Sequence, residues 1–201
     1  MSMLALIVSL LAMTFQAPPL SGDYVEVRTV SVFAGPCHYN GETMTGDRDA
    51  VLAWQFDSGV RVMAAISSQA NLADGTAART SEIVIDSSAG KSRTDAALTC
   101  ILSHDGAVLG KIVSIRPGAI SFNHENREYQ VSSPGFATLD VQGMPNDECC
   151  KQPNLVWYEP LVKLQGRKVG YTVDAHYVSD KVSDEWERMD ENGAFYGKFV
   201  Y

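Results

Sequence analysis

Apolar and polar residues alternate along much of the chain, which is the pattern of strands with one buried face. The alternation is clearest over 24–32, and Gly35-Pro36 breaks it. Later extended runs are rich in apolar and β-branched residues and are separated by turn residues. The pattern predicts strands over 24–32, 50–56, 60–66, 81–85, 111–116, 119–122, 128–132, 137–141, 169–177 and 194–201, and a further apolar run over 155–164 in which Pro160 predicts a sheet edge or a bend.

One segment has helical spacing instead. Ser92 or Thr94 can cap a helix whose apolar residues recur three and four positions apart as far as Leu102, and Gly106 is expected to end it. This helix separates two predicted strands, so it is either a crossover or a helix laid across the sheet. The three runs that follow it predict an antiparallel meander. The fold class expected is α+β, with a large, mostly antiparallel β-sheet or open barrel and one main helix packed on it.

The chain is 201 residues long, and no linker or repeat divides it after Gly22. Residues 23–201 are therefore expected to form a single β-rich domain. Residues 1–22 contain an apolar stretch from Leu4 to Phe15, which is shorter than the roughly 20 residues that cross a bilayer and is typical of a secretory signal peptide. Export to the periplasm or the extracellular space follows. An N-terminal apolar helix that packs on the domain or rests on a membrane is the alternative, because no Lys or Arg precedes Arg28.

The charge balance limits the classes of partner. The chain has 16 Lys and Arg against 24 Asp and Glu, a formal net charge of -8, and its basic residues are scattered. Nucleic acid is therefore excluded as an expected partner, while a protein partner stays open. The acidic run over 180–191 is interpreted as a solvated face.

The four cysteines fall into two environments. Cys100 lies on the predicted helix and is expected to be a small buried hydrophobic residue. Cys37 and the adjacent pair Cys149 and Cys150 lie in loops rich in Gly, Pro and Asn, where side chains with binding or catalytic roles are common. His38 follows Cys37 directly, so these four loop residues are the candidate site.

Three interpretations of the loop residues stay open. In an exported chain, a disulfide from Cys37 to Cys149 or Cys150 is the first. The second is a soft-metal site for copper or zinc made of Cys37, His38, Cys149 and Cys150, because thiolate and imidazole are the ligands that these ions select. The third is a thiol-dependent redox enzyme, which the neighbouring acids Asp147-Glu148 oppose by raising thiol pKa values. No nucleophile-elbow, zinc-protease, phosphate-loop or dinucleotide motif occurs.

The remaining histidines and aromatic residues have simpler interpretations. His124 is expected to be an exposed turn residue, and His176 a structural histidine in a strand. The aromatic residues Trp54, Trp157, Tyr158 and Trp186 are expected to be core or interface residues.

Several literal stretches resemble an uncharacterised bacterial family, the domain of unknown function 1326. They are Tyr24-Val25-Glu26-Val27-Arg28 and the segments 33–42, 146–158, 168–172 and 194–197. The resemblance implies no settled activity, and it carries over only Cys37, His38, Cys149 and Cys150 as matching positions. Members of the broader family often have several cysteines near the first strand, whereas this chain has Cys37 alone there.

The leading hypothesis is thus an exported, non-catalytic domain that binds copper or zinc through the Cys/His loops. The alternatives are the thiol-dependent enzyme and a protein-interaction module with a structural disulfide.

Overall fold

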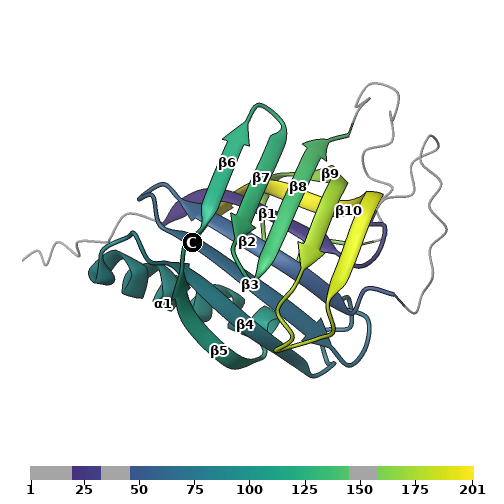
Figure 1. Ribbon diagram of the computed structural model, residues 1–201, viewed down its shortest axis with the longest axis horizontal. Helices are drawn as coiled ribbons and strands as arrows, with labels where there is room; N and C mark the ends of the chain where they lie inside the picture. The colour runs from purple at the N-terminus through teal and green to yellow at the C-terminus, as the bar shows by residue number, and fades with distance from the viewer. Residues whose placement is uncertain (1–19, 33–45, 145–157) are drawn as a thin grey trace, which may run out of the picture.

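The computed structural model describes residues 20–32, 46–144 and 158–201. These residues form one helix and ten strands that belong to a single sheet (Figure 1). The elements in chain order are β1 (Ser21–Arg28), β2 (Asp49–Phe56), β3 (Arg61–Ser68), β4 (Arg79–Asp86), α1 (Lys91–Leu109), β5 (Lys111–Gly118), β6 (Ser121–Glu125), β7 (Glu128–Ser133), β8 (Ala137–Gly143), β9 (Gln165–Tyr177) and β10 (Trp186–Val200).

The strand order across the sheet is β5-β4-β3-β2-β1-β10-β9-β8-β7-β6. Neighbouring strands are antiparallel except β4 and β5, which are parallel and are joined by the crossover helix α1. The first and last strands, β1 and β10, pair with each other at the centre of the sheet. The two edges, β5 and β6, are consecutive in the chain and are linked only by residues 119–120.

The sheet curls, so that β6, β7 and β8 lie across the strands β2 and β3 (Figure 1). An inner core fills the space between the two layers, with Val25, Met63 and Val84 from one layer and Leu139 and Tyr177 from the other. Because side chains alternate along a strand, the intervening residues of every strand face outward. The outer face of β1 to β4 is covered by other parts of the chain, whereas the outer face of β7 and β8 is exposed to solvent.

Strands β1 to β4 are covered on the outside as well. Helix α1 and the segment 158–164 lie there, and an outer core joins Leu52 and Trp54 of β2 to Ile101 of the helix and Val162 of the segment. Burial on both faces explains the nearly continuous apolar runs in β2 and β3. In β7 and β8, by contrast, buried and exposed positions largely alternate, because their outer face meets solvent.

The expected fold class is confirmed: the described residues form a mostly antiparallel, curled sheet with one helix packed on it. Within it, the predicted meander is wrong for β5 and β6, which lie at opposite edges of the sheet. Helix α1 also continues through Gly106 to Leu109, and Gly110, with φ of 64°, ends it. Strand β10 begins at Trp186, eight residues before the predicted start at Ala194. Over the described part of the predicted run 155–164 the chain forms a bend rather than a strand, as Pro160 allows.

No helix within the described ranges is both long enough and apolar enough to cross a membrane.

Candidate functional site

The predicted site residues Cys37, His38, Cys149 and Cys150 lie in 33–45 and 145–157, outside the described residues, as does most of the predicted signal segment. The structure does describe the residues on which these two cysteine-containing segments begin and end. The first segment runs from Val32 to Gly46, and the second from Met144 to Tyr158.

These four end residues meet in one region of the outer face. Val32 and Tyr158 are buried in one apolar cluster, against which Val169 of β9 packs. Met144 also packs against Val169. The beginning of each segment and the end of the second therefore contact the same small area of the sheet.

The end of the first segment joins this region through Asn71. Its side-chain amide donates hydrogen bonds to the Tyr158 hydroxyl at 3.0 Å and to the Gly46 carbonyl oxygen at 3.5 Å. Asn71 thus ties together the described ends of both cysteine-containing segments.

Arg28, at the end of β1, links the described ends of the two cysteine-containing segments most strongly. Its side chain is 1% exposed. The guanidinium forms a bidentate ion pair with Asp47, with Nε donating to Oδ1 at 2.7 Å. It also donates to the carbonyl oxygen of Glu159 at 3.0 Å and lies 4.7 Å above the Tyr158 ring. Burial lowers the pKa of Arg28, but the hydrogen bonds and charge of Asp47 outweigh burial and raise it, so this is a fixed cation.

Glu26 lies two residues earlier on the same face and is fully buried. It accepts hydrogen bonds from the Tyr24 hydroxyl at 2.5 Å and the Leu161 backbone N–H at 3.0 Å, and it lies 4.0 Å from the Arg28 guanidinium. Burial raises its pKa to about 7, although Arg28 opposes the shift. Leu161 lies three residues after Tyr158, where the second cysteine-containing segment ends. The protonation state of Glu26 therefore affects a hydrogen bond that holds the chain just after this segment.

A groove of about 470 Å³ opens beside this network, between α1, residues 72–79 and residues 158–161. Arg79 lines it together with Arg28. The Arg79 guanidinium donates to the carbonyl oxygens of Leu72 at 2.6 Å and Val108 at 3.4 Å, and its Nε has no hydrogen-bond partner among the described residues. Burial, and then the charge of Arg28, lowers its pKa. The groove therefore has a cationic wall.

From its position on the helix, Cys100 was predicted to be buried in the core. The structure places it outside the core. It is a free thiol at intermediate exposure, and its Sγ lies 3.8 Å from Nδ1 of His104. The prediction was wrong because α1 turns Ala97 and Ile101 toward the sheet and leaves Cys100 beside that face. Burial raises the pKa of the thiol, so the site does not activate it as a nucleophile.

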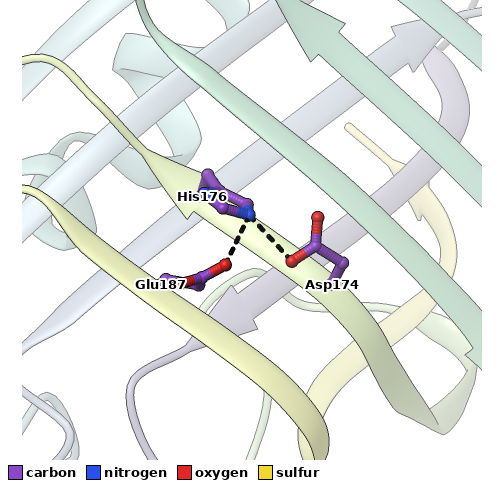
Figure 2. Close-up of side chains that lie close together, drawn as sticks. All are labelled: Asp174, His176 and Glu187. Atoms are coloured by element: carbon purple, nitrogen blue, oxygen red, sulfur yellow. Dashed lines mark ion pairs between the residues drawn. The ribbon is translucent and has the colours of Figure 1, made fainter.

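A second cluster of side chains that can ligate a metal ion lies on the outer face of β9 and β10. His176 and Asp174, two positions apart on β9, point to the same side, and strand pairing places Glu187 of β10 opposite His176. Nε2 of His176 is 2.9 Å from Oδ1 of Asp174 and 3.0 Å from Oε1 of Glu187 (Figure 2). The Asp-x-His spacing in a strand could have indicated the first pair, but Glu187 was interpreted as part of a solvated acidic run.

No model of a known protein family matches the chain, and no curated protein or solved structure matches it either. The resemblance to the domain of unknown function 1326 therefore stays a prediction.

Proposed function

We propose that the chain is an exported domain that binds a soft metal ion, copper or zinc, through Cys37, His38, Cys149 and Cys150. The observation that supports this function is the convergence of the described ends of both cysteine-containing segments on Arg28, Tyr158 and Val169. Two loops that supply ligands to one ion need attachment points close together.

The distances along the chain are compatible with a shared site. Cys37 is five residues after Val32, and Cys149 is five residues after Met144. A chain of trans peptides extends at most about 3.6 Å per residue, so the Cα atoms of Cys37 and Cys149 are within roughly 18 Å of the Cα atoms of Val32 and Met144. The buried attachment, with its ion pair and stacked aromatic ring, provides a rigid base for such loops.

The ligand types favour a soft ion. Three thiols and one imidazole match the preference of copper(I) and zinc, whereas magnesium and calcium prefer oxygen ligands. The same convergence also supports a disulfide from Cys37 to Cys149 or Cys150, so the deciding experiment must separate the two oxidation states.

The experiment combines intact mass, thiol counting and elemental analysis on full-length protein purified without chelator. We expect near-stoichiometric copper or zinc and four free thiols after the metal is removed, since the chain has four cysteines. Cys37→Ser and the double variant Cys149→Ser/Cys150→Ser should lose one equivalent of copper or zinc relative to the parent. Cys100→Ser is the matched control, because Cys100 lies on α1, and it should keep the metal.

A metal-free protein with Cys37 in a disulfide would overturn the metal site, and so would loss of metal from the Cys100→Ser control. Export is tested separately. Expression with a secretion pathway should give a mature chain that lacks the apolar N-terminal segment, as read by intact mass.

A further inference from the structure

The cluster of Asp174, His176 and Glu187 faces away from the inner core. Ala175 and Tyr177, their neighbours on β9, are buried in that core, so Asp174 and His176 point outward. The side chains of His176 and Glu187 are 38% and 54% exposed. Figure 2 shows that both carboxylates turn toward the same edge of the imidazole ring, from two adjacent strands.

The geometry suits three ligands of one cation. One oxygen or nitrogen atom from each of the three side chains lies within 4.8 Å of the other two. The separations of 2.9 and 3.0 Å between Nε2 and the two oxygens are those of neighbouring ligands in an octahedron, because bonds of about 2.1 Å at right angles place their ends roughly 3.0 Å apart.

Hydrogen bonds from the imidazole explain the cluster less well. A ring nitrogen has a single N–H direction, so it cannot donate well to two carboxylates at once. Oδ1 of Asp174 is enclosed, and no donor among the described residues makes a hydrogen bond to it, although Nε2 of His176 is 2.9 Å away. The nitrogen and the enclosed oxygen are close together without the geometry of a hydrogen bond.

The surrounding charge is an independent observation. Strand pairing places Asp140 of β8 directly opposite Asp174, so two carboxylates are neighbours across the strands. Within the described ranges, neither Asp140 nor Asp174 nor Glu187 forms an ion pair with a Lys or Arg. Like charges directly opposite in a sheet destabilise it. A bound cation would remove this repulsion.

We propose that Asp174, His176 and Glu187 bind a divalent transition-metal ion, with Zn²⁺ and Mn²⁺ as the ions of suitable chemistry. One imidazole and two carboxylates are borderline to hard ligands, which distinguishes this site from one made of thiolates. Three protein ligands leave the remaining coordination positions to water or to an anionic ligand. This site is independent of the cysteine-containing segments.

Mn²⁺ is the probe that separates the two sites, because manganese prefers oxygen and nitrogen ligands to thiolate. Binding to the full-length protein is measured by electron paramagnetic resonance and by calorimetry at neutral pH. We expect one saturable Mn²⁺ per chain. His176→Ala, Asp174→Asn and Glu187→Gln should each weaken binding about tenfold or more, as loss of a ligand does.

Two histidine variants are the controls. His124 of β6 also contacts a carboxylate, with Nδ1 3.3 Å from Oδ1 of Asp23, but Lys198 already pairs with that carboxylate at 3.0 Å. His124→Ala should therefore leave Mn²⁺ binding unchanged. His38→Ala should also leave it unchanged, because His38 belongs to the proposed soft-metal site.

Circular dichroism of each variant shows whether it is folded before its binding is interpreted. Equal weakening by His176→Ala and His124→Ala would overturn the site, because it would mean diffuse attraction to an acidic surface. Absence of saturable Mn²⁺ binding, together with absence of saturable Zn²⁺ binding in the Cys37→Ser/Cys149→Ser/Cys150→Ser variant, would overturn it too and would leave His176 as a partner in ion pairs only.

Discussion

Strands β1 to β4 and strands β6 to β9 share the inner core, but among the described residues the outer face of β1 to β4 is covered, whereas the part of β9 that carries Asp174 and His176 stays open. This difference determines what outward-facing polar residues can do. In β1, Glu26 and Arg28 are enclosed and are held by fixed partners. In β9, Asp174 and His176 stay accessible to solvent and to ions. The covered layer therefore contains the residues to which the cysteine-containing segments are attached, whereas the open layer has side chains that can bind ions from solvent.

The largest difference between the layers should appear when side chains of their outer faces are truncated. Trp54 of β2 is fully buried under the outer core, and its Nε1 donates to the Tyr201 hydroxyl at 3.0 Å. Trp54→Ala should lower the free energy of unfolding by about 4 kcal/mol. Thr138→Ala, on the open outer face of β8, should change it by no more than about 0.5 kcal/mol. Urea denaturation measures both, and equal effects would contradict the comparison.

Arg28 tests the buried charges of the covered layer. Arg28→Met removes the cation that compensates Asp47 and Glu26, and it should lower the free energy of unfolding by about 3 kcal/mol. The double variant Arg28→Met/Asp47→Leu should recover part of that loss, because it no longer leaves the Asp47 charge buried without its partner. If the double variant were no more stable than Arg28→Met alone, this account of the network would be wrong.

Glu26 should make stability depend on pH. Its pKa is raised from 4.5 to about 7 by burial, so the folded chain binds this proton more tightly than the unfolded chain does. Stability should therefore fall as pH rises from about 4.5 through 7, by at most about 3 kcal/mol. Glu26→Gln stays neutral and lacks this dependence. Relative to the parent, the variant should thus gain stability with increasing pH in denaturation measured from pH 4.5 to 8, and a constant difference would refute the shift.

The smallest predicted effect concerns the helix that covers β3 and β4. Gly106 lies inside α1, and no atom within 4 Å would contact a Cβ added there. Gly106→Ala should raise the free energy of unfolding by about 0.5–1 kcal/mol, because alanine loses less backbone entropy in a helix. Thermal unfolding measures the gain. A loss of stability would mean that the helix does not continue through this residue.

Strand bounds were predicted more accurately for strands that are apolar along their whole length than for strands with a charged half. The runs in β2 and β3 were predicted to within about two residues because their apolar and β-branched residues are dense. The first half of β10 was missed because charged residues such as Glu187 dominate it. The opposite-edge positions of β5 and β6 could not be predicted, since periodicity gives the faces of strands but not their order in a sheet.

The candidate sites were predictable to different degrees. Ligand types alone indicated the cysteines and His38, and the structure adds where their segments are attached. The cluster around His176 was missed because it depends on strand register, which brings Glu187 opposite His176 from eleven residues away along the chain. A two-residue period indicates that Asp174 and His176 share a face, yet it gives no information on the strand beside them.

The pairing of β1 with β10 matters for how the molecule is made. Ser21 pairs with Val200, so the centre of the sheet joins residues that are far apart along the sequence. During synthesis, β1 has one unpaired edge until β10 has left the ribosome, and such an edge can pair with strands of other chains. The native sheet is completed only after β10 has been made, which predicts slow folding dominated by the pairing of β1 with this distant strand.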